Sequence, residues 1–215
     1  MVHIITLATS KGGTGKTTLA AGLATYWQNH GLSVGMVDAD PNANLTRWFA
    51  KGEIHNIPIT SESDEGAIID AVDELAGNHD IVIVDIAGFA NQVMVYAIGV
   101  STLVLIPSKP SEDDVLEAIK TKRLVENAAR LTRREIPYYV VITQGKQGTH
   151  VMTHTRKQFA AFEIPVLKAE IMHRTAFQDA RFHGTTPILM EPRSKASQEL
   201  AVLAKEVNSI LTAEQ

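Results

Sequence analysis

The segment KGGTGKTT, residues 11–18, lies between the apolar run VHIITLA, residues 2–8, and a longer run over residues 17–30. The first run is typical of a buried β-strand, and the second of an α-helix that ends at Gly31. A glycine-rich turn in this position, closed by Gly-Lys-Thr, is the pattern of a phosphate-binding loop. Its glycines let backbone N–H groups approach phosphate oxygens, and the free N–H groups of the helix point at the same anion. The segment therefore predicts a nucleotide-binding fold.

The positions of this loop have expected roles in binding ATP and Mg²⁺. Lys16 would contact the β- and γ-phosphates, and the hydroxyl of Thr17 would ligate magnesium. Further contacts to the nucleotide are expected from Lys11, Gly12, Gly13, Thr14, Gly15 and Thr18. The alternative is a glycine-rich turn that binds nothing, but both the spacing and the flanking elements favour the phosphate loop.

Short apolar runs alternate with longer amphipathic runs along the rest of the chain. Further strands are expected over residues 33–37, 81–84, 102–106, 138–143 and 166–171, and helices over residues 64–76, 149–162 and 194–211. Another helix is expected to begin after Ser111, because acidic residues follow this N-cap residue in the first turn. The alternation predicts a doubly wound α/β fold, with a mostly parallel sheet and helices on both faces. No linker or repeat interrupts residues 1–215, so we expect a single domain.

The composition excludes several classes of protein. The chain has 215 residues, of which 45% are hydrophobic, a net charge of −4 and no cysteine. This length suits one sizeable core, and the lack of cysteine excludes disulfides, thiolate zinc sites and iron–sulfur clusters. No apolar run approaches the ~18–20 residues of a membrane-spanning helix, and no basic leader precedes the first strand. We expect a cytoplasmic protein whose binding to nucleic acid would depend on a local basic patch.

Three aspartates lie where strands of such a sheet end. Asp38 and Asp40 follow the run SVGMV, and Asp85 follows the run IVIV. Ligands of open α/β sheets bind at the carboxyl ends of the strands, so these side chains are expected at the phosphate site. Asp85 would hold magnesium through water, and Asp38, two residues before Asp40 on the same strand face, would support the metal shell. A cap or turn role before Pro41 is the alternative for Asp40.

The second position of SKGGTGKT is a lysine, which departs from the plain phosphate-loop pattern. With this lysine the segment resembles the deviant Walker A loop of the ParA/MinD group of ATPases. The resemblance extends to DADPNANLT at residues 38–46 and to IVIVDIAG at residues 81–88, and it covers nearly the whole chain. It implies a P-loop ATPase that forms a nucleotide-sandwich homodimer.

The resemblance implies catalytic roles for Lys11, Lys16 and Asp40. Lys11 would reach across the dimer to the partner's phosphates and neutralise transition-state charge, as an arginine finger does. Asp40 would position or polarise the attacking water. In the family, the backbone N–H at the position of Gly88 senses the γ-phosphate. A solvated loop lysine is the alternative for Lys11.

Later segments resemble the family less closely. VVITQGKQ, residues 140–147, matches the strand whose end approaches the adenine, so Thr143 or Gln144 would contact the base. Met172, His173 and Arg174 stand where the family has a proline–arginine turn beside the base. This departure leaves the base contact of that turn open.

Basic residues gather in the last third of the chain. In the family, such residues hold chromosomal DNA through its phosphates without sequence preference, a mode of binding that weakens with salt. The resemblance assigns this role to Arg174, Arg181, Arg193 and Lys195. Solvated surface charges are the alternative for each of them.

The implied function is ATP-dependent DNA partition or positioning, for a plasmid or chromosome. Its implied partners are a second copy of the chain, non-specific nucleoid DNA and a ParB-type centromere-binding protein that stimulates slow hydrolysis. The chain begins directly at the first expected strand. It therefore resembles the small subgroup without the N-terminal DNA-binding region, and we expect no operator-specific binding.

Two other functions within the family stay open on the sequence. A VirC-type helper of DNA transfer, or an organelle positioner, would use the same ATPase, and LTRW at residues 45–48 is similar to the VirC type. A MinD-like regulator would bind a membrane through a basic amphipathic helix at its C-terminus. This chain ends NSILTAEQ, without a basic cluster, so no membrane partner is expected. Within LTRW, Trp48 is expected in the core.

Overall fold

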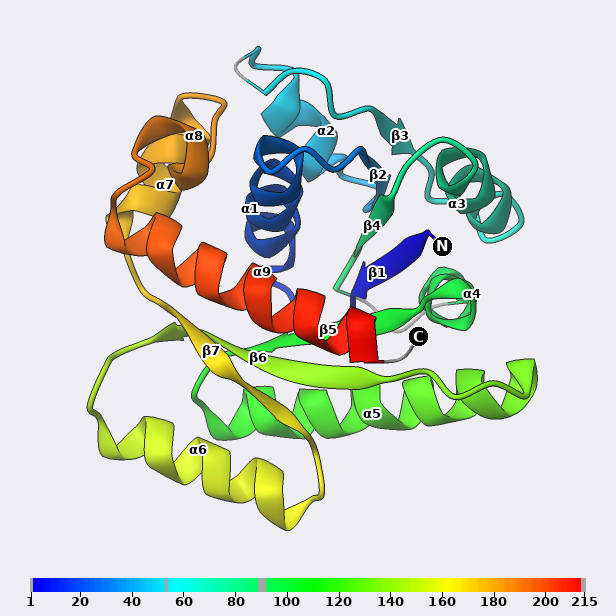
Figure 1. The fold of residues 1–215 in the computed structure, drawn as a ribbon. Helices are drawn as coiled ribbons and strands as arrows, with labels where there is room; N and C mark the ends of the chain where they lie inside the picture. Colours follow the sequence, from blue (N-terminus) through cyan, green and yellow to red (C-terminus); the bar gives the residue numbers. More distant parts are fainter. Residues whose placement is uncertain (1, 53, 89–91, 214–215) are drawn as a thin grey trace.

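The computed structural model describes residues 2–52, 54–88 and 92–213, and within these ranges one seven-stranded sheet forms the centre of the molecule (Figure 1). The strands are β1 His3–Leu7, β2 Val34–Ala39, β3 Ile59–Ser61, β4 Ile81–Ile86, β5 Leu103–Ser108, β6 Tyr138–Gly145 and β7 Val166–Met172. Their order in the sheet is β3-β2-β4-β1-β5-β6-β7, and neighbouring strands are parallel. The predicted parallel α/β fold is confirmed.

Helices cover both faces of this sheet. They are α1 Lys16–Asn29, α2 Asn44–Phe49, α3 Ile68–Ala76, α4 Gln92–Val100, α5 Glu112–Thr132, α6 His150–Ala161, α7 Thr175–Phe182, α8 Pro187–Met190 and α9 Lys195–Ala213. Helices α1, α2, α8 and α9 pack on one face, and α3 to α6 on the other. Among the described residues, no helix has both the length and the apolar character of a membrane span.

The two covered faces explain why the central strands are apolar at most positions. Along β1, Ile5 and Leu7 pack toward α1 and α9, while Ile4 packs toward the opposite helices. Successive side chains of a strand point to opposite faces, so a strand that is covered on both sides needs an unbroken apolar run. The run at residues 81–84 predicted a strand for this reason, and β4 extends it to Ile86.

Several elements differ from the sequence expectations. Strands β2 and β4 continue past the expected ends, so that Asp38 and Asp85 lie within strands. The expected helix over residues 64–76 begins at Ile68, because residues 64–67 form a turn in which the Asp64 side chain accepts the Gly66 N–H. Helices α2, α4, α7 and α8 and strand β3 had no sequence prediction. The expected cap of α5 is confirmed, since the Ser111 hydroxyl accepts the Asp114 N–H.

Helices α1 and α9 are in close contact at Gly22. A Cβ atom at this position would lie 2.7 Å from Cδ2 of Leu200, a side chain with no exposed surface. The pair is supported nearby by Trp27, whose Nε1 donates to Asn208 at 2.8 Å. This packing holds α1, and with it the loop that precedes α1, against the sheet.

We predict that Gly22→Ala lowers the free energy of unfolding by about 1–3 kcal/mol, because the buried Leu200 has no room to move aside. This loss outweighs the higher helix propensity of alanine. Urea unfolding in the absence of nucleotide measures the change. Gly99→Ala in α4 is the matched control, because its nearest neighbour would lie at 3.4 Å. The control should be neutral or stabilising by up to about 1 kcal/mol, and equal losses at both sites would contradict the packing argument.

Candidate nucleotide-binding site

The phosphate loop connects β1 to α1 in a conformation that only its glycines adopt easily. Gly13 has φ 74° and Gly15 has φ 99°, values that disfavour any residue with a Cβ. Gly15 is the N-cap of α1 and supplies no side chain to cap the first turn. The N–H groups at the start of α1 are therefore available to an anion, as the sequence predicted.

The loop forms the floor of a cavity of about 520 Å³. Its lining combines the loop and the start of α1 with residues from the ends of β2 and β4, from β6 and from α7. The lining residues are Gly12, Gly13, Gly15, Lys16, Thr17, Thr18, Asp40, Asn42, Asn44, Ile86, Ala87, Gly88, Gln144 and Arg181. The cavity thus brings together most of the predicted nucleotide contacts, and it adds two asparagines and an arginine.

Lys16 is the first residue of α1, and its side chain extends back into the loop. Only 7% of its surface is exposed. Its Nζ donates to the carbonyl of Lys11 at 3.1 Å and to the carbonyl of Thr9 at 3.4 Å. Burial lowers the pKa of Lys16, and the nearby charges of Asp85 and Asp40 oppose that shift. The ammonium is held by the loop itself, in the position from which a P-loop lysine contacts phosphates.

Asp85, near the end of β4, is almost wholly buried. Neither carboxylate oxygen has a hydrogen-bond partner among the described residues. Burial raises the pKa of Asp85 to about 7; the hydroxyl of Thr17 lowers it in part, and the charge of Asp38 raises it further. An unpaired buried carboxylate beside the hydroxyl of Thr17 fits a magnesium site, because Mg²⁺ takes oxygen ligands.

Asp38 and Asp40 have different surroundings. Asp38 is fully buried, and its Oδ2 accepts the N–H and the hydroxyl of Thr46 at 2.8 and 2.9 Å. It therefore anchors the start of α2, and its expected support of the metal stays a prediction. Asp40 lines the cavity, where Asn42 and Asn44 donate to its two oxygens. Burial alone would raise the pKa of Asp40, but these hydrogen bonds hold it below the usual value.

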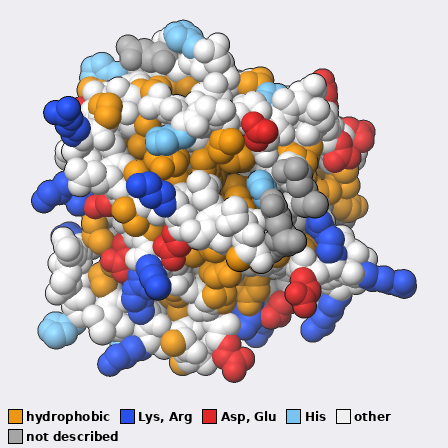
Figure 2. Space-filling model, viewed as in Figure 1, with side chains coloured by type: hydrophobic (Ala, Val, Ile, Leu, Met, Phe, Trp, Pro, Cys, Tyr) orange, Lys and Arg blue, Asp and Glu red, His pale blue; other side chains and the backbone are white. Residues whose placement is uncertain are grey.

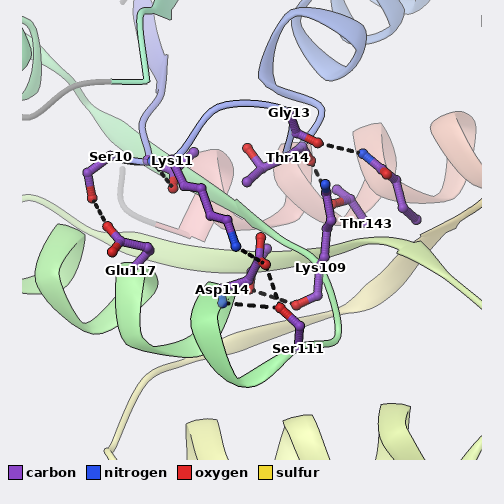
Figure 3. A network of polar contacts seen from close by, with 12 residues as sticks. Ser10, Lys11, Gly13, Thr14, Lys109, Ser111, Asp114, Glu117 and Thr143 are labelled. Carbon is purple, nitrogen blue, oxygen red and sulfur yellow. Dashed lines mark hydrogen bonds and ion pairs between the residues drawn. The ribbon is translucent and has the colours of Figure 1, made fainter.

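Lys11 has a partner within its own chain (Figure 3). Its Nζ lies 2.8 Å from Oδ2 of Asp114, in the first turn of α5. This hydrogen bond raises the pKa of Lys11. The preceding Ser10 donates to Glu117 of the same helix at 2.6 Å. The proposed cross-dimer role of Lys11 would require the ammonium to leave Asp114.

Gly88 packs directly on the phosphate loop. A Cβ atom at Gly88 would lie 2.8 Å from the backbone N of Gly12 and 2.9 Å from the carbonyl carbon of Lys11. Backbone atoms cannot move aside as a flexible side chain can, so this contact requires glycine. The proximity agrees with the expected nucleotide-sensing position of Gly88.

A smaller hollow of about 160 Å³ adjoins the loop where the base was expected. Thr143 and Gln144 line it, and both also hold the loop: Thr143 donates to the carbonyl of Thr14 at 2.7 Å, and Gln144 to that of Gly13 at 2.9 Å. The remaining lining residues are Gly15, Thr18, Leu19, Ile171, Met172, His173, Arg174, Phe177 and Gln178. The turn at residues 172–174, which the sequence left open, therefore borders this hollow.

The four expected DNA-binding residues do not share one environment. Arg174 is paired with Glu199 through Nε at 3.0 Å and through its terminal nitrogen. Arg181 lies over the ring of Trp48 and lines the larger cavity. Arg193 and Lys195 are exposed, at or just before the start of α9. On the face shown in Figure 2, Lys and Arg side chains alternate with Asp and Glu and form no continuous patch.

Sequence reasoning missed the contributions of Asn42, Asn44, Asp114 and Arg181 to this region. The two asparagines stand in DPNANL and were quoted only as part of a family pattern. Asp114 was expected only as one of the acidic residues in the first turn of the helix after Ser111. It is 103 residues from Lys11, and no local pattern links the two. Arg181 was counted only as one of several basic residues.

Known proteins share this fold. Residues 5–188 match the family model described as the CobQ/CobB/MinD/ParA nucleotide binding domain. The protein ParA of Rhizobium radiobacter is 30% identical, with 81% of this chain and 80% of the relative covered. The protein virC1 of Rhizobium radiobacter is 26% identical, with 99% of this chain and 100% of the relative covered. The solved septum site-determining protein MinD of Pyrococcus horikoshii, complexed with Mg-ADP, superposes with a TM-score of 0.82 at 18% identity, covering 100% and 99% of the two chains.

A parallel sheet with a glycine-rich loop after β1, and carboxylates near the ends of the adjoining strands, defines a P-loop nucleotide-binding protein. The family model spans most of the chain. This protein therefore belongs to the CobQ/CobB/MinD/ParA nucleotide binding domain family, and the resemblance seen in the sequence is confirmed.

We predict that Asp85→Asn stabilises the nucleotide-free protein at pH 8 but not at pH 5. The carboxyl has a pKa of about 7 when folded and near 4 when unfolded. The folded state therefore binds the extra proton between these values, and the stability of the wild type falls as pH rises through this window. Asparagine stays neutral, so its stability relative to the wild type should rise by about 1–3 kcal/mol from pH 5 to pH 8.

Urea unfolding at the two pH values, without nucleotide or magnesium, tests this prediction. Asp73→Asn is the control, because Asp73 is exposed on α3. A stability difference for Asp85→Asn that is the same at pH 5 and pH 8 would rule out a titrating Asp85.

Proposed function

We propose that this protein is an ATPase that binds ATP with Mg²⁺, forms a nucleotide-sandwich homodimer, and positions DNA in partition. The single observation that carries this proposal is a buried cation close to a buried anion at the phosphate loop. Lys16 lines the cavity, and Asp85, which has no hydrogen-bond partner among the described residues, directly precedes Ile86 in the cavity wall. A cation set for phosphate and a carboxylate without a partner are complementary to a magnesium nucleotide. Membership of the family supports the choice of a nucleotide.

In this proposal each group has a defined task. Lys16 holds the β- and γ-phosphates, while the hydroxyl of Thr17 and the carboxylate of Asp85 hold the magnesium ion directly or through water. Mg²⁺ supplies charge neutralisation on the phosphate oxygens. Asp40, whose hydrogen bonds favour its ionised form, orients the attacking water. Its asparagine partners fix the carboxylate at the wall of the cavity.

The homodimer would change the partner of Lys11. In the single chain, the ammonium is neutralised by Asp114. In the dimer, each Lys11 would exchange this carboxylate for the phosphates bound by the other subunit, where it would stabilise the charge that develops during transfer. Both partners are anionic, so the exchange replaces one charge-assisted contact by another.

DNA binding would come from the exposed cations near α9. Arg193 and Lys195 have no carboxylate partner among the described residues, unlike Arg174. Phosphate contacts of this type carry no sequence information, so the proposed binding is non-specific. A ParB-type partner that stimulates hydrolysis and releases the DNA completes the proposed cycle, which takes place on the nucleoid.

A second candidate function keeps the ATPase and changes the cargo. The virC1 relative is covered over its whole length, and LTRW ends in Trp48, the residue on which Arg181 of the cavity stacks. A VirC-type role in DNA transfer uses the same nucleotide cycle. The two functions differ in which partner protein stimulates hydrolysis.

We predict that Lys11→Ala binds ATP but stays monomeric, whereas Lys16→Ala loses ATP binding altogether. Calorimetry measures the affinity, and light scattering with a non-hydrolysable ATP analogue measures the mass. Lys205→Ala, on the exposed side of α9, controls for the loss of one positive charge. A normal dimer of Lys11→Ala would exclude the cross-dimer contact. Unchanged ATP affinity in Lys16→Ala would overturn the proposed function as a whole.

We predict that the double variant Arg193→Ala, Lys195→Ala weakens DNA binding equally on unrelated duplexes. Each lost phosphate contact should lower the slope of log affinity against log salt by roughly 0.9. Fluorescence anisotropy at several salt concentrations, with ATP present, measures both quantities. A variant with the same charge loss elsewhere, Arg130→Ala with Lys205→Ala, is the control. A loss confined to one DNA sequence would argue for base recognition instead.

A further inference from the structure

Helix α7 borders both hollows of the nucleotide site. Phe177 and Gln178 line the smaller hollow, where the base is expected, and Arg181 lines the larger cavity at the phosphate loop. Arg181 follows Phe177 by four positions and Gln178 by three, so it lies on the same side of the helix as both. One face of α7 therefore follows the site from its base end to its phosphate end.

The position of Arg181 is fixed from two sides. Its guanidinium carbon lies 5.2 Å from the ring centroid of Trp48, which is 2% exposed and donates through Nε1 to the carbonyl of Thr185 at 3.1 Å. The carbonyl of Arg181 accepts from Lys51 at 3.2 Å. Stacking on a rigid indole restricts the guanidinium without using its N–H donors.

The charge of Arg181 is not neutralised by a carboxylate among the described residues. Arg156 and Arg174, by contrast, are each paired with a glutamate. The acid that shares the cavity with Arg181 is Asp40, and its oxygens accept from Asn42 and Asn44. A stacked arginine with free donors, facing a cavity that is built for phosphate, is suited to bidentate contact with phosphate oxygens.

We propose that Arg181 binds the phosphate chain of the nucleotide held by its own subunit. This inference rests on the proposed function, because it assumes that the cavity takes a nucleoside polyphosphate. It gives the site a second cation that comes from α7 rather than from the phosphate loop. Trp48 acts as a positioning residue, since it sets the guanidinium at the cavity wall.

The proposal replaces the DNA contact that the sequence suggested for Arg181, and the two roles predict different losses. A nucleotide contact predicts weaker binding of every ligand that carries the phosphate chain, with or without a base. A DNA contact predicts weaker binding of DNA at unchanged nucleotide affinity. Inorganic tripolyphosphate separates the phosphate contact from any effect on the base hollow.

The test compares Arg181→Gln with Arg130→Gln, which removes the same charge from an exposed position on α5 outside the cavity. Calorimetry with magnesium measures the affinity for ATP and for tripolyphosphate. Arg181→Gln should weaken both by about 10-fold or more, the size of one charge-assisted hydrogen bond, while Arg130→Gln stays within about twofold. Trp48→Phe should keep most of the affinity because it keeps a ring beneath the guanidinium, and thermal unfolding without nucleotide checks that each variant is folded.

Three results would overturn the proposal. They are unchanged affinity of Arg181→Gln for both ligands, a loss for ATP without a loss for tripolyphosphate, and a loss of DNA binding alone. A wild-type protein that does not bind ATP, or a Lys16→Ala variant that binds it normally, would instead refute the proposed function. Failure of this inference and failure of the proposed function are therefore distinguishable.

Discussion

Two buried carboxylates lie side by side near the carboxyl ends of two neighbouring strands. Asp38 and Asp85 are register partners on the neighbouring parallel strands β2 and β4, and both are almost wholly buried. Asp38 is satisfied by the start of α2, whereas Asp85 has no hydrogen-bond partner among the described residues. Burial raises the pKa of Asp85, and the neighbouring charge of Asp38 raises it further. The fold tolerates two adjacent buried carboxylates because the ammonium of Lys16 lies nearby, and a bound metal ion would neutralise their charge further.

The elements around the phosphate loop bring these carboxylates and the ammonium of Lys16 close together. The sheet fixes the carboxylates, α1 brings Lys16, and the contact of Gly88 with the loop holds the ends of β4 and β1 together. Lys11 lies outside this group and is balanced by Asp114 of α5. The two lysines of the loop thus differ in their surroundings: Lys16 is buried within the loop, whereas Lys11 is held at its outer edge by an ion pair with α5.

The sequence was sufficient for the loop and for every described strand of the sheet except β3, because their signals are local. The unbroken apolar run of β4 and the glycines of the loop each report their own environment, and both predictions are confirmed. The pairs Lys11–Asp114 and Trp48–Arg181 are not local, since each joins segments more than a hundred residues apart in the sequence. Helix α7 was missed for a related reason: among its buried residues only Ala180 is fully enclosed, so its apolar pattern is weak.

The weak apolar pattern of α7 has a physical meaning of its own. A helix that packs fully against a core shows an apolar stripe, as α3 does with Ile68, Val72 and Leu75. Helix α7 instead directs Phe177, Gln178 and Arg181 at the two hollows. The composition of this face thus follows from lining the two hollows more than from packing a core, and a mixed aromatic, amide and cationic face would suit the proposed nucleotide along its length.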